Sequence, residues 1–94
     1  MSVKTFKDLE FKDHPMVKSA KEAIANGADM EEYAKARQAI VKFDNGKELS
    51  VVFGSVFYSN GVDTYEAMEY DGCEPRGYLT KEEVTAYMLE IQEG

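Results

Sequence analysis

The sequence predicts an α+β domain. It consists of an antiparallel meander of three to four strands, with one or two N-terminal helices and a C-terminal amphipathic helix packed on one face. An Asn-Gly turn at residues 45–46 separates two runs of alternating apolar residues. A capping box at Thr80 and Glu83 opens an apolar stripe of helical period. Pro15 and Gly27 bracket a second such stripe. The 94 residues suffice for one core, so we expect a single domain over residues 1–94.

The N-terminal part predicts helix over residues 16–35, after an edge strand or extended lead-in at residues 5–11. Asp13 and Asp29 are placed to cap two helix starts. The apolar stripe of the first helix comprises Val17, Ala20 and Ile24.

The sheet is predicted within residues 38–70, with strands on both sides of the Asn-Gly turn and a third from residue 64. Residues 73–77 are expected to form a loop. The strand at residues 49–58 is apolar on both faces. If Val52, Val56 and Tyr58 form an exposed apolar face, we expect it to pair two copies into a homodimer; the alternative is that the N-terminal helices cover this face.

The C-terminal helix is predicted over residues 80–92. Its apolar positions fall at i, i+3, i+4 and i+7, the period of one buried helix face. They are Val84, Tyr87, Met88 and Ile91.

Charge is unevenly distributed along the chain, whose net charge is −7. Residues 1–43 hold eight Lys or Arg and seven Asp or Glu, whereas residues 44–94 hold three and eleven. An acidic half repels phosphate backbones, so we expect no direct DNA binding through it. A partner with a basic surface is expected instead. The alternative is that the acids only confer solubility.

Several of these acids lie close together in the sequence, near one tyrosine. The predicted partner-binding residues are Glu66, Glu69, Tyr70, Asp71 and Glu74. Because successive side chains of a strand point to opposite faces, Glu66 and Glu69 should lie on opposite sides of the sheet. The tyrosines of the meander are a second candidate for protein contacts, with core packing as the alternative.

Catalytic and metal-binding patterns are missing from the sequence. There is one cysteine and one histidine, and no phosphate-binding glycine motif. Cys73 and His14 could form a nucleophile–base dyad, but a structural thiol and a helix-start histidine are favoured. We expect no enzyme activity, no metal and no cofactor. With one cysteine and no apolar leader or membrane-spanning stretch, a cytoplasmic location is expected.

Several segments resemble short uncharacterised phage and prophage proteins of enteric bacteria. The similarity covers most of the chain, whereas the residues from Met16 to Tyr33 depart from the shorter members. The segments that carry it are Phe6-x-Asp8-Leu9-Glu10-Phe11, His14-Pro15, Phe43-Asp44-Asn45-Gly46, Leu49-Ser50-Val51-Val52, Tyr65-Glu66-Ala67 and Gly77-Tyr78-Leu79-Thr80-x-Glu82-Glu83-Val84.

The resemblance implies one sheet with a C-terminal helix, a mobile-element origin and action in the host cytoplasm. Small acidic phage proteins often block host machines, so a host-defence inhibitor such as an anti-CRISPR protein is the function it implies. The target would be a host protein or ribonucleoprotein complex with a basic surface. The alternative is a self-associating structural or accessory phage protein.

Overall fold

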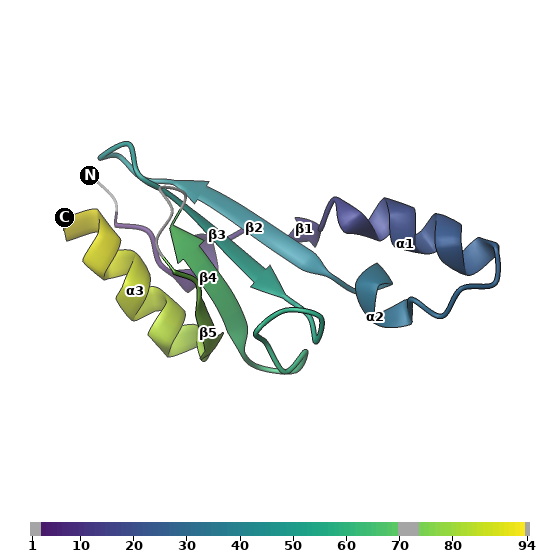
Figure 1. Cartoon of the computed structure of the whole chain (residues 1–94). Coiled ribbons are helices and arrows are strands. Elements are labelled where there is room, and N and C mark those ends of the chain that lie inside the picture. Colours follow the sequence, from purple (N-terminus) through teal and green to yellow (C-terminus); the bar gives the residue numbers. More distant parts are fainter. Residues whose placement is uncertain (1–2, 70–73, 94) are drawn as a thin grey trace.

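Five antiparallel strands form one sheet in the order β1-β2-β3-β4-β5 in this computed structural model (Figure 1). The structure describes residues 3–69 and 74–93. The strands are β1 (Lys12–Asp13), β2 (Arg37–Lys42), β3 (Glu48–Phe53), β4 (Tyr65–Glu69) and β5 (Arg76–Leu79). The helical elements are the 3₁₀ turn η1 (Phe6–Asp8), α1 (Met16–Ala25), α2 (Glu31–Ala34) and α3 (Lys81–Glu93). The predicted α+β class is confirmed, but the strand count is five rather than three to four.

The hairpin of β2 and β3 turns at the predicted Asn-Gly pair. Gly46 has φ +87°, a conformation that favours glycine, and Asn45 Oδ1 accepts the backbone N–H of Lys47 at 3.1 Å. Asn45 Nδ2 also donates to the carbonyl of Ile91 at 2.9 Å. The turn therefore ties the hairpin to the last turn of α3.

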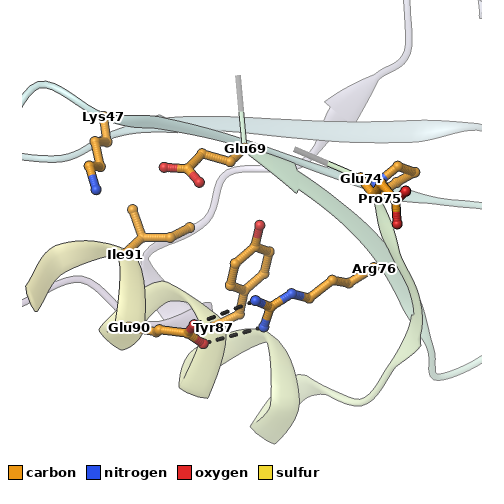
Figure 2. Close-up of a pocket in the computed structure, with 8 residues that line it drawn as sticks. All are labelled: Lys47, Glu69, Glu74, Pro75, Arg76, Tyr87, Glu90 and Ile91. Atoms are coloured by element: carbon orange, nitrogen blue, oxygen red, sulfur yellow. Dashed lines mark hydrogen bonds and ion pairs between the residues drawn. The ribbon is translucent and has the colours of Figure 1, made fainter. Parts of the chain in front are cut away.

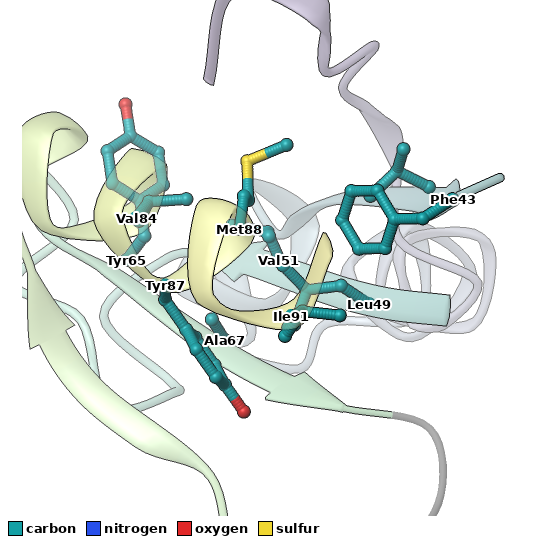
Figure 3. Packing of buried hydrophobic residues seen from close by; sticks show 10 residues of the cluster. Phe43, Leu49, Val51, Tyr65, Ala67, Val84, Tyr87, Met88 and Ile91 are labelled. Atoms are coloured by element: carbon teal, nitrogen blue, oxygen red, sulfur yellow. The ribbon is translucent and has the colours of Figure 1, made fainter. Parts of the chain in front are cut away.

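The core lies between α3 and one face of the sheet (Figure 3). The four predicted positions of α3 are all buried: Val84, Tyr87, Met88 and Ile91. From the sheet side they meet Leu49, Val51 and Ala67, none of which is exposed. The capping box that opens α3 is present, with Thr80 N–H donating to Glu83 Oε1 at 3.1 Å and Glu83 N–H donating to Thr80 Oγ1 at 3.2 Å. The predicted C-terminal helix is confirmed.

The N-terminal segment closes the side of this core. It forms η1 and then the two-residue β1, rather than one extended lead-in. Phe6 packs edge-on against Tyr65 at 5.0 Å between ring centroids, and its N–H donates to Thr85 Oγ1 of α3. Gln92 binds both the N–H and the carbonyl of Lys4, which fastens the start of the chain to the end of α3.

The predicted helical region 16–35 is two helices with a break, and neither packs on the sheet face. α1 and α2 pack chiefly on each other and extend past the end of β2, so the molecule measures 48 × 23 × 22 Å (Figure 1). Gly27 ends α1 with φ +94°, as predicted. Neither Asp13 nor Asp29 caps a helix, because the N-cap residues are Pro15 and Met30 and neither makes a side-chain cap bond.

Two strand assignments made from the sequence are wrong. The predicted strand 49–58 ends at Phe53, because Gly54 adopts φ +143° and the chain turns into a loop. The loop predicted at residues 73–77 overlaps β5, which pairs with β4 through Tyr65–Leu79 and Ala67–Arg76. This pairing contains an irregularity, and Tyr78 within it has φ +55°.

Candidate functional site

The predicted acidic residues divide between the two faces of the sheet. Glu66 is paired with Val52, and Glu69 is paired with Leu49, whose side chain faces α3. Glu66 therefore points away from α3, as the alternation predicts, and its Oε1 accepts the N–H of Tyr58 at 2.9 Å. Two other predicted contact residues, Tyr70 and Asp71, lie outside the described residues.

Glu69 and Glu74 line one cavity of about 600 Å³, here called the acidic groove (Figure 2). Its walls are α3, the end of β4, the start of β5 and the turn after β2. Glu90 of α3 adds a third carboxylate, and Lys47 and Arg76 bring two positive charges to the same cavity. Tyr87 and Ile91 lie at its base and are only 5% and 4% exposed. The structure thus brings Glu69 and Glu74 together and excludes Glu66 from this site.

Arg76 already occupies part of the groove. Its guanidinium lies 3.9 Å from the centre of the Tyr87 ring, within the range of a cation–π contact. The same group donates to both oxygens of Glu90, with N–O distances of 3.3 and 3.5 Å (Figure 2). Both partners of this ion pair are about half exposed, so it contributes little to stability. The contacts of Arg76 show that the groove can hold a guanidinium between an aromatic ring and a carboxylate.

Sequence reasoning missed Lys47, Arg76 and Glu90 of this site, whereas it had placed Tyr87 in the buried stripe of the C-terminal helix. Tyr87 and Glu90 are three residues apart on α3, so they lie on one side of the helix. The helical spacing could have paired them. Nothing in the sequence indicates that Arg76 reaches them, because that contact depends on how β5 lies against α3.

The opposite face of the sheet carries exposed apolar side chains. Ile40, Ser50 and Met68 form one row across β2, β3 and β4. Ile40 is 58% exposed and Met68 is 41% exposed. In an antiparallel sheet the solvent face is usually polar, so these two residues depart from the expected pattern.

The residues predicted for self-association do not form one strand face. Val52 is in β3 but only 9% exposed. Val56 is half-buried and Tyr58 is exposed, and both lie in the loop beyond the strand. The Tyr58 ring lies near that of Tyr78, with 6.4 Å between centroids.

The His14 side chain is held by one hydrogen bond and one ring contact within the chain. Its Nδ1 accepts the N–H of Met16 at 3.1 Å, and its ring lies 5.3 Å from that of Phe57. Burial lowers the pKa of His14 below its ordinary value. Cys73 lies outside the described residues, so the structure does not test the dyad of Cys73 and His14.

Comparison of the chain with protein-family models, curated proteins and solved structures finds no match. Over residues 3–69 and 74–93, no three His, Cys, Asp or Glu side chains are grouped so that they could hold a metal ion. None of the helices in this described part is long and apolar enough to cross a membrane.

Proposed function

We propose that this protein is a non-enzymatic binding protein whose acidic groove docks on a basic surface of a protein or ribonucleoprotein partner. The observation that carries the proposal is the convergence of Glu69, Glu74 and Glu90 on one cavity. Two of the three come from the sheet and its connection, and one comes from α3. Carboxylates from separate elements thus meet at a concave surface.

The chemistry of the groove suits a lysine or arginine side chain. Such a side chain can lay its alkyl stem along apolar surface while its charged head reaches a carboxylate. The three glutamates offer the acceptors, whereas Tyr87 and Ile91 are only 5% and 4% exposed and leave little apolar surface for the stem. Arginine is favoured over lysine because it binds a carboxylate with two hydrogen bonds. Arg76 binds Glu90 in this way and already covers the Tyr87 ring.

The class of partner follows from the charge of the C-terminal half. Its excess of acids disfavours direct binding of DNA or RNA through this part. The same charge is attracted to sites that normally hold nucleic acid. Together with the resemblance to phage and prophage proteins, this favours a host-defence or nucleic-acid-processing complex, such as a CRISPR complex, in the cytoplasm of an infected cell.

The test is a matched pair of charge reversals. Glu69→Lys/Glu74→Lys changes the groove, whereas Glu22→Lys/Glu31→Lys changes two exposed acids of α1 and α2 by the same total charge. The α1/α2 pair should alter the free energy of unfolding by no more than about 1 kcal/mol, because both of its residues are exposed. Glu69 is half-buried, so the groove variant can lose more stability. Urea unfolding of both variants establishes that they are folded.

Each variant is then used as bait in nuclease-treated host lysate, and the retained complex is purified for measurement of association rates. We expect the wild type and the α1/α2 variant to retain the same basic complex and the groove variant to lose it. Association with the wild type should slow as salt is raised. Equal retention by the two variants would mean that the groove acids serve only solubility.

A further inference from the structure

All three asparagines of the chain precede a glycine: they are Asn26, Asn45 and Asn60. Each is exposed, and the glycine that follows has a positive φ, of +94°, +87° and +73° in turn. A glycine after an asparagine leaves the backbone nitrogen unhindered by a Cβ atom, which makes the pair prone to deamidation. Because the dipeptide and its exposure are the same at the three positions, differences in their reactivity must come from the contacts that the fold makes.

Deamidation of such a pair consumes only water. The glycine nitrogen gives its proton to a base and attacks the asparagine Cγ atom, so that an N–Cγ bond forms. The Cγ–Nδ2 bond breaks, and Nδ2 takes up a proton and leaves as ammonia. Water then opens the resulting succinimide ring at either carbonyl, which yields aspartate or isoaspartate. The attack requires the asparagine side chain to turn from its hydrogen bonds toward the glycine nitrogen.

The attacking nitrogen is restrained alike at the three positions. The N–H groups of Gly27, Gly46 and Gly61 each donate to an oxygen of a residue two or three positions earlier, at 3.0, 2.9 and 3.1 Å. This bond must open before any of the three nitrogens can attack. It therefore gives no preference among the three pairs.

The asparagine side chains, in contrast, are restrained to different degrees. Asn60 Oδ1 accepts the backbone N–H groups of residues 62–64 at 2.8, 3.0 and 3.1 Å, and its Nδ2 donates to Asp63 Oδ1 at 2.7 Å. The Asn45 side chain makes two bonds, one within its own turn and one to α3. Both side chains must break several bonds before they can react.

Asn26 is the least restrained of the three. Its Nδ2 donates to the carbonyl of Glu22 at 3.0 Å, and no donor among the described residues reaches its Oδ1. It directly follows α1, in the connection to α2 at the end of the molecule away from the sheet (Figure 1). Residues 25–29 are all exposed, so opening the last turn of α1 uncovers none of the core. Such helix ends open at a small fraction of the free energy of global unfolding.

We infer that Asn26 is the site at which the folded protein deamidates, whereas the fold protects Asn45 and Asn60. The product changes the end of α1. Aspartate has no N–H to donate to the Glu22 carbonyl, and it adds a negative charge at the C-terminal end of α1, where the helix dipole is also negative. It also lies four residues after Glu22, a spacing at which like charges destabilise a helix. Deamidation therefore loosens α1 irreversibly and leaves the sheet and α3 intact, an effect that is independent of the acidic groove.

The first experiment measures the three rates in one sample. The folded protein is held in warm, mildly alkaline buffer, and its tryptic peptides are analysed by mass spectrometry. Residues 22–35, 43–47 and 48–76 are three such peptides, each with one asparagine. We expect Asn26 to gain the mass of one dalton at least about tenfold faster than Asn60, with Asn45 between them, because local opening is easiest at Asn26.

The same incubation in guanidinium chloride is the control. Once the fold is removed, the three rates should lie close together, because the dipeptide is the same. The inference is overturned if Asn45 or Asn60 converts as fast as Asn26 in the folded protein. It is also overturned if Asn26 of the folded protein stays unconverted over the time in which the denatured chain reacts.

The second experiment measures the effect on α1. Asn26→Asp is the chemical product, and Asn26→Ala loses the same hydrogen bond without adding a charge. Hydrogen exchange of the last amides of α1 should be fastest in Asn26→Asp, intermediate in Asn26→Ala and slowest in the wild type. High salt should reduce the difference between the variants, because salt screens the charge. The amides of α3 should exchange alike in all three proteins. Wild-type exchange of α1 in Asn26→Asp would contradict the loosening.

Discussion

His14 accepts the backbone N–H of Met16 through Nδ1, at 3.1 Å, immediately before α1 begins. An imidazole nitrogen that accepts a hydrogen bond carries no proton, so the folded protein holds this side chain neutral. The backbone N–H of His14 also donates to the carbonyl of Ala36 at 2.9 Å. His14 thus joins the start of α1 to the segment that leads into β2.

Protonation of His14 should destabilise the fold. Burial lowers the pKa of His14 below 6.5 in the folded state, so the unfolded state takes up the proton first as the pH falls. The stability due to the neutral ring is therefore complete above pH 6.5 and is lost as the pH falls through the lowered pKa. Urea unfolding between about pH 5 and pH 7 measures the loss.

His14→Asn is the control for this effect, because an asparagine oxygen can accept the same N–H but does not titrate. The carboxylates of the chain act equally in both proteins, so the difference between the two pH profiles isolates His14. We expect the wild type to lose more stability toward low pH than the variant. Parallel profiles would contradict the prediction.

Truncation of Ile91 should remove part of the core. Ile91 is buried between α3 and the sheet, and Ile91→Ala should lower the free energy of unfolding by about 2–4 kcal/mol through lost burial and the cavity it leaves. Leu89→Ala, on the outer side of the same helix, should cost less than about 1 kcal/mol. Chemical denaturation measures the free energy of unfolding of both variants. A loss for Ile91→Ala no larger than that for Leu89→Ala would mean that the apolar stripe of α3 is not part of the core.

Ser59 organises the loop between β3 and β4 from a buried position. Its Oγ donates to the carbonyl of Thr64 at 2.6 Å and accepts the N–H groups of Gly54 and Gly61 at 3.3 and 3.1 Å. Ser59→Ala leaves these backbone groups without that partner. It should lower the free energy of unfolding by about 1–3 kcal/mol. Ser55→Ala removes an exposed hydroxyl of the same loop, which donates to Glu32 Oε2 at 2.5 Å. It should have a smaller effect on urea unfolding, because water can replace an exposed bond. Equal costs would mean that water replaces the Ser59 bonds.

The parts of the fold that were predicted correctly depend on neighbours in the sequence. The Asn-Gly turn needs only the conformational freedom of Gly46 and the side chain of Asn45. The start of α3 needs only Thr80 and Glu83, and its buried side follows from a period of three to four residues. For this reason the structure contains both the turn and the helix start as predicted.

The parts predicted wrongly depend on pairing between segments. β5 is four residues long, includes Gly77 and follows Pro75, so its own propensity for a strand is weak. It becomes a strand because β4 offers an edge to pair with. Conversely, residues 56–58 have strong strand propensity but follow Gly54, whose backbone turns the chain away from the sheet.

The same distinction applies to the candidate surfaces. Alternation along β4 was sufficient to separate Glu66 from Glu69, because side chains on a strand point to opposite faces. The acidic groove also needs Tyr87 and Glu90 of α3 and Arg76 of β5, and no local pattern brings these elements together. The exposure of Ile40 and Met68 likewise depends on where α1 and α2 lie. Short-range periodicity determined the elements and their faces, whereas long-range packing decided which faces meet and which remain exposed.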